Sequence, residues 1–120
     1  MYEIETNNTV FESIKHTDEN GVECWYAREL MNALGYSKWQ NFKIVINKAI
    51  TACKNSNIDY TEHFTDVSKV LEGGNKAILT VKDYKLSRYA CYLIAQNGDS
   101  RKKVISLAQT YFAVQTRNLV

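Results

Sequence analysis

The sequence LSRYACYLIAQNGDSRKKVISLAQTYFAVQTR, residues 86–117, decides the fold of this chain. Its apolar residues recur at steps of three and four on both sides of Asn97-Gly98, which is the spacing of two amphipathic helices. Asp83 is the expected N-cap of the first helix, and Asp99 or Ser100 that of the second. So short a connection predicts an antiparallel helical hairpin near residues 84–117 that forms much of the core. The expected buried stripes are Leu86, Tyr89, Ala90, Leu93 and Ile94, then Val104, Ile105, Ala108, Tyr111, Phe112 and Gln115.

Two further helices are predicted before this hairpin. Residues 27–34 form a compact helix, and Gly35 stands where a left-handed residue commonly ends one. Ser37 is the expected N-cap of the next helix, and Gln40, three residues later, would complete a capping box. This helix is predicted to run to about Lys54. Its apolar stripe is Trp39, Phe42, Ile46, Ala49, Ile50 and Cys53.

The remaining segments give weaker patterns. We expect a loose tail at residues 1–6 and a polar loop at residues 55–65. A short helix near residues 10–14 followed by a strand at 22–26 is favoured, although residues 18–21 could instead be the turn of a β-hairpin. Residues 67–71 and 77–81, on either side of Gly73-Gly74, suggest another hairpin. The first of these segments also fits helical spacing, so only the second is predicted as a strand.

Together these segments predict one α+β domain over residues 1–120, mostly helical with a small strand element. No apolar run approaches the roughly 20 residues that span a bilayer, and the N-terminus lacks the pattern of a signal peptide. A cytoplasmic location is therefore expected. Because the last helix still looks periodic near Val120, we expect the natural protein to continue beyond it.

The charges are segregated, although the net charge is only +2. Residues 31–58 contain four lysines and no acidic residue, and residues 73–120 contain eight basic residues against two acidic ones. Two basic blocks in a nearly neutral chain can still form a strongly positive face.

The sequence offers no catalytic centre and no cofactor or metal site. Cys24, Cys53 and Cys91 are far apart and match no ligand spacing, so reduced, metal-free thiols are expected. His16 and His63 have no metal-ligand partner at i+3 or i+4 and no clear nucleophile partner. We therefore expect a protein that is not an enzyme.

The two helices joined at Gly35 resemble a helix-turn-helix, in which the second helix enters the major groove of DNA. Asn and Gln can bind adenine through two hydrogen bonds, and Lys can reach guanine or phosphate. The alternative is an ordinary solvated helix face. The candidate DNA-binding residues on this helix are Lys38, Gln40, Asn41, Lys43, Asn47 and Lys48.

A second basic cluster is Arg101-Lys102-Lys103, which is expected in the first turn of the last helix. Cations there oppose the helix dipole unless a phosphate binds among them. Lys82, Lys85 and Arg88 are expected to add charge on the exposed side of the preceding helix. Of the tyrosines, Tyr84 and Tyr92 remain candidates for stacking on bases.

Four stretches of the sequence resemble the bacterial DNA-damage-inducible protein D family. They are GVECWYAREL at residues 21–30, LGYSKWQNF at 34–42, LSRYACYLIAQNGD at 86–99 and AQTYFAVQTR at 108–117. The matching region of that family is its N-terminal part, which is similar to the BRO-N domain of viral and phage proteins, including antirepressors. The resemblance implies a BRO-N-like fold, a role tied to DNA binding or the SOS response to DNA damage, and a further C-terminal region.

We therefore expect a DNA-binding module that acts through a basic face, with the type of DNA strand left open. The alternative is a protein-interaction module that regulates a recombination or repair factor, or a repressor, without strong DNA binding. Steep salt dependence would favour the first interpretation, because phosphate contacts release counterions.

Overall fold

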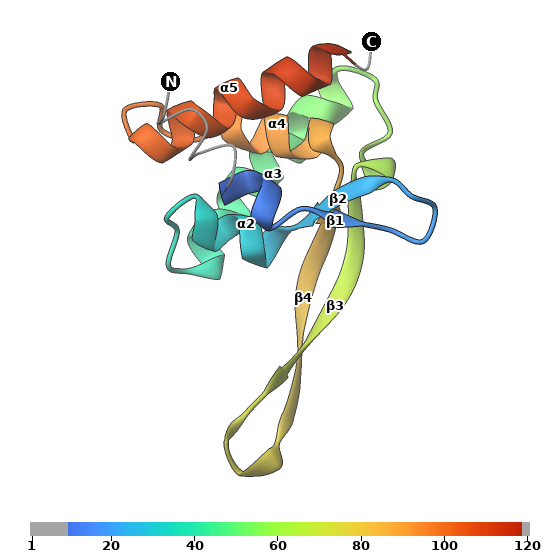
Figure 1. Ribbon diagram of the computed structural model, residues 1–120, viewed down its shortest axis with the longest axis vertical. Coiled ribbons are helices and arrows are strands. Elements are labelled where there is room, and N and C mark those ends of the chain that lie inside the picture. Colours follow the sequence, from blue (N-terminus) through green and yellow to red (C-terminus); the bar gives the residue numbers. More distant parts are fainter. Residues whose placement is uncertain (1–9, 119–120) are drawn as a thin grey trace.

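The computed structural model describes residues 10–118, with side chains described to residue 113 except at Lys76. The expected tail at residues 1–6 and the side chain of Gln115 lie outside this part. Figure 1 shows the helices gathered at one end of the molecule and a long β-hairpin that projects away from them. The α+β class is confirmed, and the sheet is larger than the small element expected.

The predicted helical hairpin is present as α4, Arg88–Gln96, and α5, Lys103–Asn118. Its first cap was wrongly assigned: Ser87 is the N-cap of α4 and its hydroxyl accepts from the Ala90 N–H at 3.0 Å. The strand before α4 extends through Leu86, so Asp83 lies inside a strand. At the connection, a Cβ atom on Gly98 would lie 2.9 Å from Cγ2 of Ile105, so only glycine allows the two helices this close.

The start of α5 also differs from the prediction. Because the helix begins at Lys103, Arg101 and Lys102 lie before its first turn. The Asp99 carboxylate accepts from the backbone N–H of Arg101 at 3.0 Å, which holds this connection in a turn.

The pair of helices around Gly35 is confirmed, with α2 at Ala27–Ala33 and α3 at Trp39–Asn55. Gly35 has a φ of 84°, the left-handed conformation expected after a helix. The capping box is wrong, because Lys38 is the N-cap of α3 and makes no side-chain capping hydrogen bond. Tyr36 packs on Phe42 with ring centroids 5.1 Å apart, and the helix begins one residue later than an N-cap at Ser37 would place it.

The sheet is antiparallel with strand order β1-β2-β4-β3. Its short strands are β1, His16–Thr17, and β2, Glu23–Tyr26. Residues 10–13 are helical, so a short helix, a strand and a hairpin turn all occur in this region. The Asp18 carboxylate closes that turn by accepting from the N–H groups of Asn20 and Val22.

The second hairpin is formed by β3, Phe64–Glu72, and β4, Ile78–Leu86. Residues 67–71 therefore form a strand and not a helix, and the polar segment before them contains a short 3₁₀ helix at Tyr60–Glu62. The two strands pair along their whole length, from Phe64 opposite Leu86 to Glu72 opposite Ile78. Only the inner end of β4 also pairs with β2, at Lys85 and Leu86.

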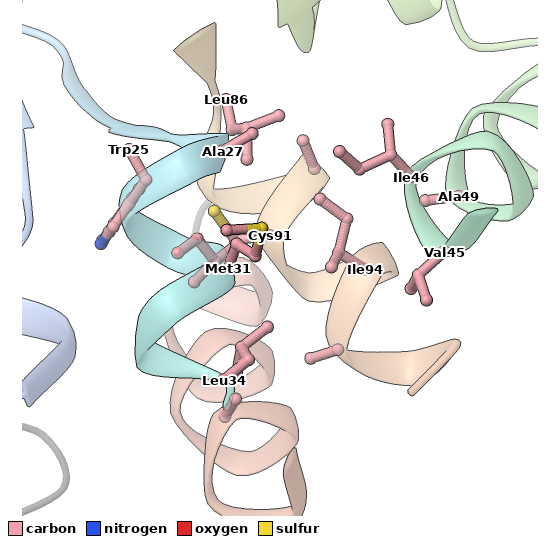
Figure 2. Packing of buried hydrophobic residues seen from close by; sticks show 14 of the residues in the cluster. Trp25, Ala27, Met31, Leu34, Val45, Ile46, Ala49, Leu86, Cys91 and Ile94 are labelled. Carbon is pink, nitrogen blue, oxygen red and sulfur yellow. The ribbon is translucent and has the colours of Figure 1, made fainter. Parts of the chain in front are cut away.

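The core lies between the helices and the inner end of the sheet. Figure 2 shows α4 contributing Cys91 and Ile94 between Met31 of α2 on one side and Ile46 of α3 on the other. All three cysteines are buried and free, and burial raises the pKa of the Cys91 thiol well above its usual value.

Arg88 is a structural residue and not the exposed cation that the sequence suggested. Its side chain is 5% exposed, and its Nε and Nη2 donate to Glu23 at 2.5 and 3.0 Å. The guanidinium also lies 4.9 Å from the Trp25 ring centroid and 5.0 Å from that of Tyr111. The start of α4 turns this residue inward, where it joins β2, α4 and α5.

We expect Arg88→Ala to lower the free energy of unfolding by about 2–3 kcal/mol, because it removes a buried guanidinium with two hydrogen bonds to Glu23 and leaves that carboxylate only the weaker pair with Lys15 at 3.9 Å. The matched control is Arg101→Ala, since Arg101 is 90% exposed in its pair with Asp99. That change should cost less than about 0.5 kcal/mol. Urea unfolding followed by circular dichroism compares the two, and equal losses would contradict the structural role of Arg88.

The fold should also lose stability in alkali through Tyr111. Burial, and then the hydrogen bond to Glu12, raise the pKa of Tyr111 to about 12 from 10.0. Because the folded state holds this proton more tightly than the unfolded state, Tyr111 stabilises the fold. This contribution is fully present below pH 10 and is lost as the pH rises to about 12. The free energies of unfolding of the parent chain and of Tyr111→Phe should therefore approach each other over this pH range. A difference that stays constant would contradict the role given to Tyr111.

Candidate nucleic-acid interface

A groove runs between α3 and the inner end of the β3–β4 hairpin. Its volume is about 550 Å³, and its walls include Asn47 and Lys54 of α3, Tyr60 of the 3₁₀ helix, and Asp66, Lys82 and Tyr84 of the hairpin. Lys43 lies one turn before Asn47 and donates to the Tyr84 hydroxyl. We call this feature, with Lys43, Lys54 and Lys82, the lysine groove.

Each of the three lysines is positioned by an aromatic ring. Nζ of Lys43 lies 4.6 Å from the Tyr84 ring centroid, and Nζ of Lys82 lies 5.1 Å from the same centroid. Nζ of Lys54 lies 4.9 Å from the Tyr60 centroid. Such cation–π contacts restrict a flexible side chain without neutralising its charge.

Tyr84 is only 6% exposed, so the prediction that it stacks on bases is wrong. Its ring also lies 6.5 Å from that of Trp39 in a stacked arrangement. Tyr92, the other candidate, is half-buried and stacked on Tyr89 with centroids 6.2 Å apart.

The ion pairs separate the cations into two classes. Three of the predicted site residues outside the groove pair with carboxylates: Lys85 with Asp18 at 3.5 Å, Arg88 with Glu23, and Arg101, whose side chain is 90% exposed, with Asp99. Within the part of the chain that the structure describes, Lys43 and Lys54 form no ion pair. Lys43 and Lys54 therefore bring uncompensated positive charge to the groove, and Lys48 presents a further charge on the outer side of α3.

Lys82 is intermediate between these classes. It pairs with Asp66 at 3.3 Å, but the side chains are 51% and 76% exposed, so water weakens the attraction. Hydrogen bonds to Tyr84 and Asp66 raise the pKa of Lys82, which keeps it charged at neutral pH.

Other predicted residues lie on the outer side of α3. Gln40, Asn41, Asn47 and Lys48 are exposed, as is Lys38 at the N-cap. Asn47 also lines a second hollow with Lys48 and Ile44 on this outer side. Ile44 is 55% exposed, which makes it an apolar residue in a polar face.

The cluster Arg101-Lys102-Lys103 is separate from the groove. Nζ of Lys102 lies 5.9 Å from the Tyr36 ring centroid, which places this turn beside the connection between α2 and α3. Lys82 and Lys85, which were expected on a helix, lie on β4.

Sequence reasoning missed four residues of this region. Arg28 stacks 4.2 Å from the Trp39 centroid and its Nε donates to the Lys82 carbonyl at 2.7 Å. Lys54 and Tyr60 line the groove itself. Lys54 had a usable signal, because it follows Lys43 and Asn47 by eleven and seven residues on one stripe of α3. No such signal exists in the sequence for Arg28 and Trp39, because their contacts with this region depend on the position of β4.

His16 is exposed at the surface, and His63 is half-buried. Nε2 of His16 lies 2.7 Å from Glu29, and Nδ1 of His63 lies 2.7 Å from the Ser87 hydroxyl that caps α4. In residues 10–118, no group of three His, Cys, Asp or Glu side chains could hold a metal ion, and no helix is long and apolar enough to cross a membrane.

Comparison with known proteins gives two matches. The family described as "BRO family, N-terminal domain" matches residues 13–113. The chain is 48% identical over 107 residues to DNA damage-inducible protein D from Escherichia coli (strain K12). The match covers 89% of this chain and 39% of that relative, so the chain spans about 39% of the length of the curated protein it matches. No solved structure matches it.

Proposed function

The chain belongs to the BRO family through its N-terminal domain, and from this premise we propose that it is a DNA-binding module whose contact surface is the lysine groove with the outer face of α3. The relative is named for its induction by DNA damage, and we extend that context to this chain: a cytoplasmic protein that acts on DNA in the damage response.

The observation that supports this proposal most directly is the set of three lysines on tyrosine rings. Phosphate binding by a free lysine must restrict a long side chain, which costs up to about 2 kcal/mol of rotamer entropy. Tyr84 and Tyr60 already restrict Lys43, Lys54 and Lys82 in the folded protein. Part of this entropy is therefore lost on folding and not on binding. Their ammonium groups keep their charge for phosphates.

The same contacts favour a duplex over a single strand. Binding of single strands relies on aromatic faces on which bases stack. In the lysine groove Lys54 lies over Tyr60, while Tyr84 is buried beneath Lys43 and Lys82. These rings therefore position cations for a phosphate backbone and offer no open platform to a base.

Base recognition is assigned to the outer face of α3. Gln40, Ile44 and Asn47 follow one another at steps of four and three, so they share one exposed stripe next to the groove. Gln and Asn can bind adenine through two hydrogen bonds, and an apolar side chain can contact the thymine methyl group. With α2 before it, α3 would then act as the recognition helix of a helix-turn-helix.

A charge-neutralising triple variant tests the phosphate contact. We expect K43Q/K54Q/K82Q to weaken binding similarly on all duplexes and to flatten the salt slope by about 0.9 for each phosphate that is no longer neutralised. The matched control is R101Q/K102Q/K103Q, which removes equal charge from the separate turn and should weaken binding less. Titration of labelled duplex at two salt concentrations measures both.

If the turn variant loses as much affinity as the groove variant, phosphate binding lies at the turn and the proposed surface is wrong. Binding by the parent chain that hardly changes with salt would instead favour the protein-interaction module.

A second variant tests base recognition. We expect Q40A/N47A to reduce the discrimination between duplex sequences by about 1–3 kcal/mol for each base that is no longer recognised, with a smaller effect on binding to random sequence. Asn20→Ala, at an exposed residue of the turn between β1 and β2, is the control. Competition among a panel of duplexes measures the relative affinities, and unchanged ratios would exclude α3 as the recognition helix.

A further inference from the structure

The outer half of the β3–β4 hairpin is an arm with apolar residues that no core covers. Figure 1 shows this arm extending away from the helices. Val70 is 63% exposed, Ile78 72% and Leu79 55%. A hairpin of two strands is only marginally stable in water, and exposed apolar side chains at its end gain nothing by burial. Their presence indicates a surface that becomes covered on binding.

The register of the hairpin places two of these residues on the face that forms the lysine groove. Alternate residues of a strand share a face, so Ile78 lies on the same face as Lys82 and Tyr84. Val70 is opposite Thr80 and therefore lies diagonally next to Ile78 on this face. Leu79 is on the other face.

One face of the hairpin therefore changes character along its length. At its inner end it presents Lys82, opposite Ser68, and then Thr80, opposite Val70. Ile78 completes it at the tip, where Glu72 lies opposite. An ammonium group and two hydroxyls followed by apolar side chains match a ligand that offers phosphates first and stacked bases next.

We propose that Val70 and Ile78 form a wedge that enters the minor groove of the duplex held in the lysine groove and bends it. This inference rests on the proposed function and names what the arm adds to it. Apolar side chains inserted at a base step unstack it partly and kink the duplex, and the extra protein contact offsets that cost.

The length of the arm fits this geometry. Tyr84 is the sixth residue after Ile78, which corresponds to about 20 Å along a strand. A turn of duplex DNA is about 34–36 Å, so half a turn is about 17–18 Å. When α3 lies at the major groove and the duplex lies along the arm, the tip reaches the same side of the DNA about half a turn away. At that point the minor groove faces the protein.

A carboxylate beside the wedge gives the proposal a distinctive consequence. Glu72 lies opposite Ile78 on the same face. Near DNA its negative charge opposes the phosphates, so Glu72→Gln should strengthen binding at low salt. A tip that never approaches the duplex would leave affinity unaffected by this change.

The main experiment measures DNA bending by energy transfer between dyes at the two ends of a 30-base-pair duplex, a length of about three helical turns. We expect the parent chain to shorten the end-to-end distance and V70T/I78T to abolish this change, while binding weakens about tenfold. Leu79→Thr is the matched control, because it removes an exposed apolar residue from the opposite face. It should leave both bending and affinity unchanged. Circular dichroism checks that each variant is folded.

The outcomes separate this inference from the proposed function. If the parent chain binds duplex through the groove lysines without bending it, or if V70T/I78T still bends it, the wedge is wrong and the proposed function stands. If the parent chain is a dimer in sedimentation and V70T/I78T is a monomer that binds DNA normally, the tip joins two copies and the wedge is again wrong. Absence of any duplex binding would overturn both.

Discussion

The insertion of the inner end of β4 into the helical body is the interaction on which the other features depend. The Asp83 carboxylate is 2% exposed and accepts from the backbone N–H of Arg28 at 3.0 Å, near the start of α2. The N-cap residue of α2, Tyr26, has no side-chain capping bond of its own, so a strand distant in sequence supplies the cap. One residue later Tyr84 packs on Trp39, and Leu86 is fully buried. These contacts fix the hairpin beside α3 and thereby create the lysine groove.

The helices could be predicted because their signals are local. Apolar residues at steps of three and four identified α3, α4 and α5, and Gly35 marked the end of α2 through a conformation that glycine adopts at little cost. The caps were less predictable, since Asp83 and Ser87 are both good N-cap residues and lie only four apart. The choice between them depends on the distant partner: the Arg28 N–H takes Asp83, which leaves Ser87 to cap α4. Likewise, Val67, Leu71 and their neighbours fit two periodicities, and pairing with β4 selects the strand.

The candidate site was predictable only in part, for a related reason. Lys43 and Asn47 belong to a regular helix, so their place on one stripe could be deduced, whereas Arg28 and Tyr60 join the region through contacts between distant segments. Charge in the sequence did not separate structural from accessible cations. Arg88 and Lys82 are basic residues only six positions apart, but the side chain of Arg88 is 5% exposed and that of Lys82 is 51% exposed. The direction of a side chain at the junction of β4 and α4 determines this difference, and composition does not encode it.

The kind of partner that holds a cation determines what the cation can do next. A buried carboxylate fork, as at Arg88, gains strength from the low dielectric around it, but it consumes the charge and makes the residue part of the fold. An aromatic face attracts the cation through its quadrupole and leaves the full positive charge in place. Lys43 and Lys54 are held in the second way, so their field extends into the groove, whereas the Asp18 carboxylate 3.5 Å from Lys85 offsets the charge of that lysine. In a chain whose net charge is only +2, the groove lysines still bring positive charge together on one surface. The arm projects from that same surface, which is why its apolar tip and the lysines can act on one ligand.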